Sequence, residues 1–170
     1  MADDSKKSTT ITGLDTDPPL RPNSWVAGGV PKSYVETVEA ADAASIGSKY
    51  RFFRVTSWMR VEDLFVMNDA LSAGAMDVGL YDTADNGGAV VDADFFASAV
   101  SLASANKATG GTNIAWEAAG SASDISKVTQ PIWQVLGLTS DPRKEYDVVG
   151  TVTTALGAAG TISLRGKFVG

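Results

Sequence analysis

Alternation of apolar and polar side chains is strictest in Ile162-Ser163-Leu164-Arg165-Gly166-Lys167-Phe168. Successive side chains of a β-strand point to opposite faces, so Ile162, Leu164 and Phe168 face one way. Ser163, Arg165 and Lys167 face the other way. One apolar face and one polar face predict a strand that covers a hydrophobic core.

The same period of two recurs through the rest of the chain. It is seen in residues 34–38, 49–55, 61–67, 75–81, 112–118 and 146–152. The apolar run that ends at Met67 breaks the alternation, which indicates burial on both faces or a bulge near Asp63. Glycine-rich turns at residues 86–88, 108–111 and 157–160 separate the strands. The pattern predicts an all-β fold, a jelly-roll-like β-sandwich of about seven or eight antiparallel strands.

Two segments favour a short helix. Asp94, or else Asp92, is placed to cap a helix over residues 95–100, because a carboxylate accepts hydrogen bonds from the first amides. Residues 130–137 form the second candidate, of about two turns at 3.6 residues per turn. There Pro131 suits the first helical position, and Gly137 suits a left-handed stop.

Residues 1–30 differ in composition from residues 31–170, which form the predicted sandwich domain. Asp, Ser, Thr, Lys, Pro and Gly dominate this N-terminal part. Pro18, Pro19 and Pro22 favour extended backbone. The segment is therefore either a disordered tail or an extended arm that orders against a partner, with Trp25 as its anchor.

Histidine and cysteine are absent from all 170 residues. The chain therefore lacks the usual general base near neutral pH, the thiolate nucleophile and the commonest zinc ligands, and we expect it not to be an enzyme. Its formal net charge of −6 disfavours nucleic acid as a partner. No signal peptide and no membrane-spanning stretch is expected, so we predict a soluble protein without a membrane partner.

Four carboxylates cluster in sequence around the glycines of residues 86–88, and these are Asp82, Asp85, Asp92 and Asp94. Oxygen ligands at close spacing could hold Ca²⁺, but the spacing does not fit an EF-hand. The plainer interpretation is a turn after Tyr81 and a helix cap at Asp94. A glycosidase pair would need a fixed separation that the sequence does not define.

Cations concentrate between aromatic residues in one part of the chain. Lys49, Arg51, Arg54 and Arg60 alternate there with Tyr50, Phe52, Phe53 and Trp58. Three interpretations remain open. The cations could cover apolar surface with their stems, bind single-stranded nucleic acid, or meet an acidic surface on a protein partner.

One segment resembles a known class of protein. Residues 79–102, GLYDTADNGGAVVDADFFASAVSL, are similar to small virion proteins of tailed bacteriophages, the capsid decoration or cement proteins. Residues 68–71, NDAL, and 131–138, PIWQVLGL, resemble the same class. The likeness extends over about residues 34–168 and leaves the arm outside.

The resemblance implies a β-sandwich, made in the host cytoplasm, that decorates the outer capsid surface of the virion. It implies a structural role without a cofactor or catalytic residues, in which a dimer or trimer bridges major capsid protein subunits. The alternative is a head-fibre, tail or carbohydrate-binding module, which needs an exposed aromatic platform. Trp58, Trp116 and Trp133 are its candidates.

Overall fold

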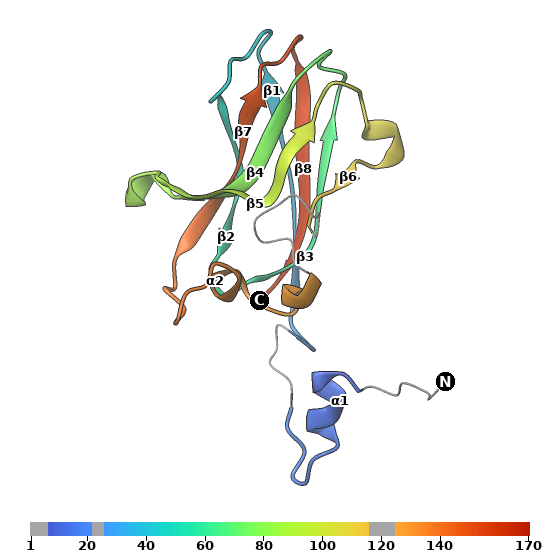
Figure 1. Ribbon diagram of the computed structural model, residues 1–170, viewed down its shortest axis with the longest axis vertical. Coiled ribbons are helices and arrows are strands. Elements are labelled where there is room, and N and C mark those ends of the chain that lie inside the picture. Colours follow the sequence, from blue (N-terminus) through green and yellow to red (C-terminus); the bar gives the residue numbers. More distant parts are fainter. Residues whose placement is uncertain (1–6, 22–25, 116–124) are drawn as a thin grey trace, which may run out of the picture.

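A computed structural model describes residues 7–21, 26–115 and 125–170 of the chain. In these residues eight strands form two antiparallel sheets that face each other (Figure 1). The strands are β1 (Pro31–Ala40), β2 (Lys49–Thr56), β3 (Arg60–Asn68), β4 (Ala75–Asp82), β5 (Val90–Ser101), β6 (Thr112–Asn113), β7 (Glu145–Thr154) and β8 (Gly160–Val169). The helices are α1 (Thr9–Leu14) and α2 (Ile132–Val135), and the 3₁₀ turns are η1 (Ala84–Asn86), η2 (Lys107–Thr109) and η3 (Ile125–Lys127).

The strand order pairs each strand from the first half of the chain with one from the second half. Sheet A has the order β1-β8-β3-β6, and sheet B has the order β2-β7-β4-β5. The first strand therefore pairs with the last, the second pairs with the seventh, and β4 pairs with β5. The predicted all-β sandwich is confirmed, and this nested order is the arrangement expected of a jelly roll.

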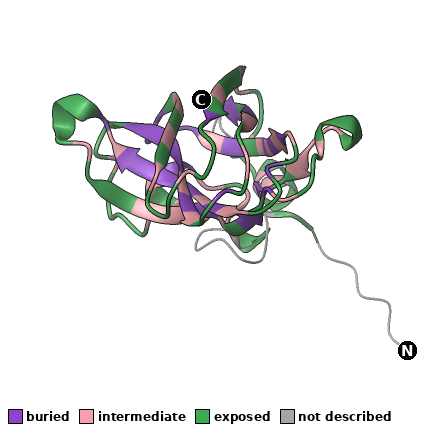
Figure 2. Ribbon diagram, turned by 90° about the horizontal axis from the view of Figure 1, so that it is seen from above, coloured by how far each residue is buried: buried purple, intermediate pink, exposed green. Residues whose placement is uncertain are grey.

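Aromatic rings join the two sheets through the core. Phe168 of β8 lies 5.7 Å from Tyr34, 5.9 Å from Phe53 and 6.3 Å from Phe96, measured between ring centroids. Tyr34 and Phe168 come from sheet A, whereas Phe53 and Phe96 come from sheet B. Figure 2 shows buried residues along the middles of the strands and exposed residues on the connections.

Most sequence-predicted strands are present at their expected places. β8 buries Ile162, Leu164 and Phe168 as the opening pattern requires. In β3 the register against β8 shifts between Val61 and Asp63, so the predicted bulge is confirmed. The predicted strand over residues 112–118 is shorter than expected, because β6 ends at Asn113. Trp116 lies outside the described residues.

The helix predicted over residues 95–100 is wrong, because these residues belong to β5. Neither Asp92 nor Asp94 caps a helix there. A helix of six residues gains little by itself in water, whereas β5 gains ladder hydrogen bonds with β4. The strand also buries both Phe95 and Phe96. Tertiary burial therefore outweighs the local preference for helix.

The second helix is confirmed but is shorter than predicted. α2 spans four residues, with Pro131 as an N-cap of extended backbone rather than as the first helical residue. Gly137 has a φ of +74°, as expected of a left-handed stop. The Ile132 amide donates to the Met59 carbonyl at 2.9 Å, and the Trp133 amide donates to the Ser57 carbonyl at 3.0 Å. These bonds fix α2 to the connection between β2 and β3.

The N-terminal arm contains one short helix, whose position the sequence analysis did not predict. α1 begins after Ser8, whose hydroxyl accepts a hydrogen bond from the Ile11 amide at 3.3 Å. The chain then turns back, and the Leu20 amide donates to the Gly13 carbonyl at 2.9 Å. Figure 1 shows α1 beyond the end of the sandwich at which α2 lies.

Candidate interaction surface

Strand β2 places three cations on the outer face of sheet B. Its register against β7 pairs Arg51 with Val149 and Arg54 with Asp147, and Phe52 is the extra residue of a bulge between them. Without that bulge Arg51 and Arg54, three residues apart, would point to opposite faces. The bulge brings both arginines, together with Lys49, to one side of the sheet.

Asp147 of β7 binds both arginines at once. Arg51 Nη1 lies 2.6 Å from Asp147 Oδ2, and Arg54 Nε lies 2.9 Å from Asp147 Oδ1. The Asp147 side chain is only 11% exposed, whereas Arg51 and Arg54 remain 38% and 45% exposed. One nearly buried carboxylate therefore holds two guanidinium groups that keep part of their surface in water.

Arg51 also reaches across the sheet to the end of β4 and the η1 turn. Its Nη1 donates to the Asp82 carbonyl and its Nη2 donates to the Gly88 carbonyl, both at 3.3 Å. Its guanidinium carbon lies 5.7 Å from the ring centroid of Tyr81, and Lys49 Nζ lies 5.2 Å from the same centroid. Arg51 thus joins the edge strand β2 to the middle of the sheet.

The charges of this surface are largely balanced within the chain. Arg54 Nη1 lies 3.6 Å from Glu145 Oε2, and Lys144 Nζ lies 3.4 Å from Asp82 Oδ1. The hydrogen bond to Asp147, aided by the charge of that carboxylate, raises the pKa of Arg54. Arg51, Arg54 and Lys144 are therefore part of a salt-bridge network.

Arg60 does not join the other predicted binding residues. It begins β3 in sheet A, and its Nη1 donates to the Val61 carbonyl at 3.4 Å. It lines a hollow of about 220 Å³ together with Gly28, Gly29 and Glu62. This hollow lies where the arm enters the sandwich. Trp25, the predicted anchor of the arm, lies outside the described residues.

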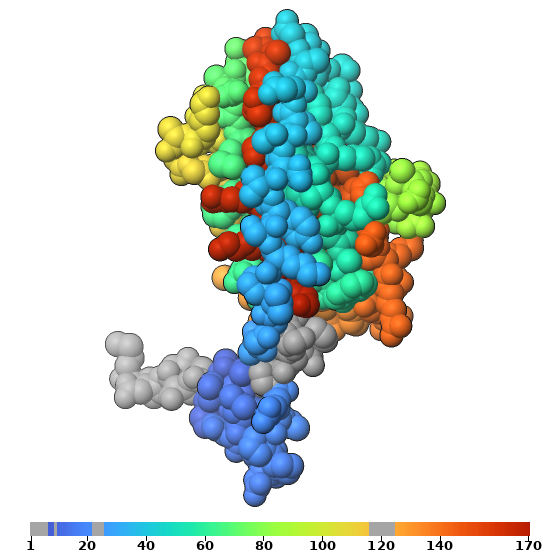
Figure 3. Space-filling view, turned by 180° about the vertical axis from the view of Figure 1, so that it is seen from behind, coloured from blue at the N-terminus to red at the C-terminus, as the bar shows by residue number. Residues whose placement is uncertain are grey.

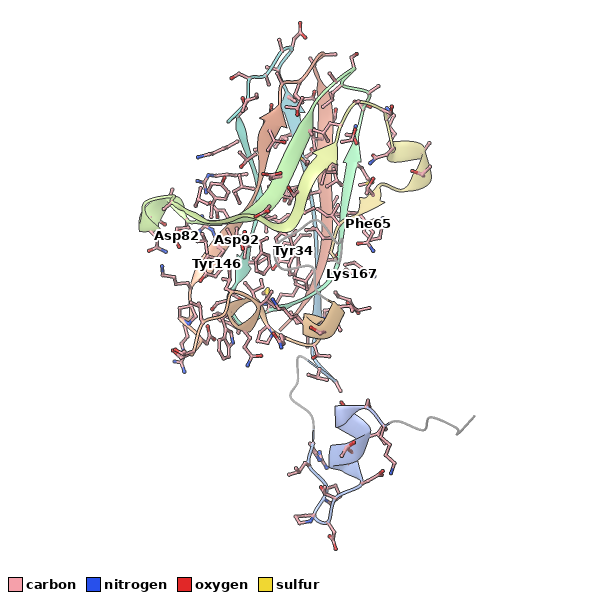
Figure 4. The ribbon with its side chains drawn as sticks, viewed as in Figure 1. Tyr34, Phe65, Asp82, Asp92, Tyr146 and Lys167 are labelled. Carbon is pink, nitrogen blue, oxygen red and sulfur yellow. The ribbon has the colours of Figure 1, made fainter. Side chains whose placement is uncertain are left out.

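The clustered carboxylates occupy separate places in the fold. Asp85 lies in the exposed η1 turn, and Asp92 pairs with Leu80 across β4 and β5. Figure 4 shows Asp82 and Asp92 near the start of this turn, with Tyr146 beside them. In the part of the chain that the structure describes, no group of three or more acidic side chains could hold a metal ion. Burial, with the charges of Asp82 and Asp141, raises the pKa of Tyr146.

Two of the three candidate platform tryptophans lie on neighbouring segments. Trp58 is 39% exposed on the connection between β2 and β3. Trp133 belongs to α2, which is hydrogen-bonded to that connection. Ile114, next to the end of β6, is buried in the core.

Sequence reasoning did not identify Asp147, on which this surface depends. The sequence feature that could have indicated its role is a single carboxylate within the apolar run of residues 146–149. That position faces outward on a central strand, where an acidic residue has cross-strand neighbours on both sides. Recognising its role required knowledge that β2 and β7 pair and that β2 carries a bulge.

The helices of residues 7–21, 26–115 and 125–170 have at most six residues, so none of them could span a lipid bilayer.

Comparisons with known proteins bear on the fold. No family model and no curated protein matches this chain. Among solved structures, the chain is similar to one in the cyanophage Pam1 capsid asymmetric unit, with a TM-score of 0.51. The two share 11% sequence identity, and the match covers 83% of this chain and 85% of that chain. At this identity the likeness shows a shared fold across most of both chains.

Proposed function

We propose that this protein is a structural component of a bacteriophage virion that lies on the outer capsid surface and bridges major capsid protein subunits. The fold likeness to a chain of a cyanophage capsid structure supports this class of role. The acidic balance of the chain suits a surface away from packaged DNA. The role requires no catalytic residue and no cofactor.

The observation that carries the proposal is the arm. Ile11, Leu14 and Leu20 are exposed large apolar side chains within one short segment of the chain. The described backbone hydrogen bonds of residues 8–20 are made within the arm itself. A segment that presents apolar side chains beyond its own domain gains free energy when a partner covers them. The arm is therefore the element that we assign to the shell.

Shell attachment of this kind works by mass action. A protein that binds only the assembled capsid lowers the free energy of that state and so opposes its rupture. The exposed parts of Lys49, Arg51 and Arg54 are assigned to a supporting contact with acidic groups of the shell, and Arg60 and Trp25 to the contact made by the arm. Each contact can be weak, because many copies act on one shell.

Cosedimentation with empty shells of the major capsid protein tests the proposal. We expect the full chain to pellet with the shells and a chain lacking residues 1–30 to remain in the supernatant. A finer variant replaces Ile11, Leu14 and Leu20 with serine, and we expect it to lose at least tenfold in affinity. The matched control is Ile46→Ser, which removes an exposed apolar side chain from the sandwich and leaves the arm intact.

Two results separate the parts of the proposal. If the full chain does not bind shells under any condition, the virion role is wrong. If the truncated chain binds as tightly as the full chain, the arm is not the contact, and the cation surface of β2 becomes the element to mutate.

A further inference from the structure

Three of the four sheet edges carry features that oppose pairing with another chain. β6 has two residues, and β2 has a bulge at Phe52 beside its row of cations. β5 shifts register three times against β4, and Ala99 within it has a φ of +53°. Short length, bulges and charge are the usual means by which an edge strand is protected.

β1 is neither short nor bulged. All ten of its residues pair with β8 without a register shift. In the described residues β1 is hydrogen-bonded to no strand other than β8. Figure 3 shows β1 along the length of the sandwich, uncovered on the side toward the viewer and with β2 beside it. Val35, at the middle of this edge, is 57% exposed.

The backbone groups that face away from β8 can be identified. The Gly170 amide donates to the Val30 carbonyl at 3.5 Å, so Val30 and Gly170 form a hydrogen-bonded pair. Such pairs alternate along an antiparallel ladder, which places the outward N–H and C=O groups on Ser33, Val35, Thr37 and Glu39. Pro31 also faces away from β8, so its missing N–H removes no hydrogen bond between β1 and β8.

We infer that a second copy of this chain pairs with β1, strand against antiparallel strand, and extends sheet A across a two-fold axis. A two-fold interface requires a surface that complements itself. In the register that places Val35 opposite Val35 of the second copy, Ser33 lies opposite Thr37 and Tyr34 opposite Glu36. Ser33, Val35 and Thr37 carry the outward backbone groups that such a ladder requires.

Burial of apolar surface favours this occupant. Lys32 lies near the beginning of β1, and Glu36 and Glu39 lie further along it. Antiparallel pairing in this register places both Lys32 and Glu36 on diagonals from Glu36 of the second copy, so the attraction of one offsets the repulsion of the other. The same register buries the exposed Val35 side chains against each other, which removes apolar surface from water.

Sedimentation equilibrium of the full chain tests this inference, which does not depend on the proposed function. We expect a mass of two chains. Val35→Glu should shift the equilibrium to one chain and weaken dimerisation at least tenfold, because two like charges would then face each other. Arg165 lies opposite Val35 on β8, so the new carboxylate has a favourable neighbour within its own sheet. The fold should therefore persist.

Ile46→Glu is the matched control, because Ile46 is 68% exposed and lies outside β1. It should leave the dimer unchanged. Since the chain contains no cysteine, Val35→Cys gives one thiol per copy, and oxidation should join two copies covalently. Ile46→Cys should not form this cross-link.

Amide hydrogen exchange gives a readout specific to strand pairing. The amides of Ser33, Val35 and Thr37 should exchange slowly in the dimer and rapidly in the Val35→Glu variant, whereas the Glu36 amide should stay protected in both. A chain that is monomeric at the highest concentration at which it remains soluble would overturn the inference. So would a dimer that Val35→Glu does not weaken.

Discussion

Asp147 stabilises the outer face of sheet B because it binds both Arg51 and Arg54 from a nearly buried position. Removing the carboxylate leaves two guanidinium groups beside each other without their shared partner. We expect Asp147→Ala to lower the free energy of unfolding by about 1–3 kcal/mol, the usual cost of an unmade charged hydrogen bond. Urea unfolding followed by circular dichroism measures this change.

The control for Asp147 is Asp42, an exposed carboxylate in the connection after β1. Asp42→Ala should change stability by less than about 0.5 kcal/mol. A double-mutant cycle with Arg51→Ala should give a coupling of about 0.5–3 kcal/mol, as expected for residues in one network. Additive losses from Asp147→Ala and Arg51→Ala would contradict this account of the surface.

The stability of the protein at acidic pH depends on the ionisation of Asp69. The hydrogen bond from Lys107, followed by that from the Thr161 amide, lowers the pKa of Asp69 below the ordinary value of an aspartic acid. A carboxyl whose pKa is lower in the folded state binds protons more tightly when the chain is unfolded. Its stabilising contribution is therefore complete above about pH 4 and is lost as the pH falls through the folded pKa.

The test for Asp69 compares the unchanged chain with Asp69→Asn by urea unfolding across acidic pH. The variant should be less stable above pH 4, and the difference should shrink as the pH falls below that value. A difference that stays constant through this range would show that the negative charge of Asp69 does not contribute.

Close contact between β4 and β5 depends on Gly79. A Cβ atom at this position would lie 2.1 Å from the Asp92 carbonyl oxygen and 2.3 Å from the Ala93 carbonyl carbon. These are backbone atoms, which cannot turn aside as a side chain does. We expect Gly79→Ala to destabilise the protein by about 3 kcal/mol, at the upper end of the cost of overpacking.

Gly87 serves as the comparison for Gly79. It has a φ of +89°, and a Cβ atom there would meet nothing within 4 Å. Gly87→Ala should cost about 1 kcal/mol, from backbone conformation alone. The two variants can be ranked by their urea midpoints. Equal losses would show that β5 shifts away from β4 without difficulty.

Strands that alternate regularly could be predicted from the sequence, because the apolar face of such a strand must pack against the hydrophobic core. β8 is of this kind, and the break in alternation before Met67 likewise indicated the bulge near Asp63 of β3. β5 could not be predicted, because Gly79 lies opposite residues 93–96 and the alternation is interrupted there. Local residue preferences then indicate a helix, and only the packing of Phe95 and Phe96 between the sheets decides otherwise.

The candidate surface was predictable only in part, for a similar reason. The sequence showed that cations gather in residues 49–60, but it did not show which of them share a face. The bulge at Phe52 unites Arg51 with Arg54, and the passage from sheet B to sheet A separates Arg60 from them. A partner such as Asp147, 93 residues from Arg54, depends on topology that no local pattern contains.

The arm and the open edge adjoin in the sequence, since β1 begins at Pro31 directly after the arm. In the proposed dimer Pro31 lies opposite Glu39 of the second copy, so the two arms leave from opposite ends of the paired strands. At roughly 3.3 Å per residue, their starting points are about 26 Å apart. Such a dimer directs its arms to two different sites, which is the geometry that bridging requires.

Linking two arms through β1 has a measurable consequence for shell binding. When one arm of a dimer is bound, the other is held near its own site, and the second binding event becomes intramolecular. We expect the unchanged chain to bind empty shells about 10²–10⁴ times more tightly than Val35→Glu, which carries the same arm on a single sandwich. Titration by cosedimentation over a range of chain concentrations measures both affinities.

Val35→Glu should still bind the shell at high concentration, whereas the dimer without residues 1–30 should not. Equal affinity of the unchanged chain and Val35→Glu would mean that the two arms of a dimer do not act on the same shell together.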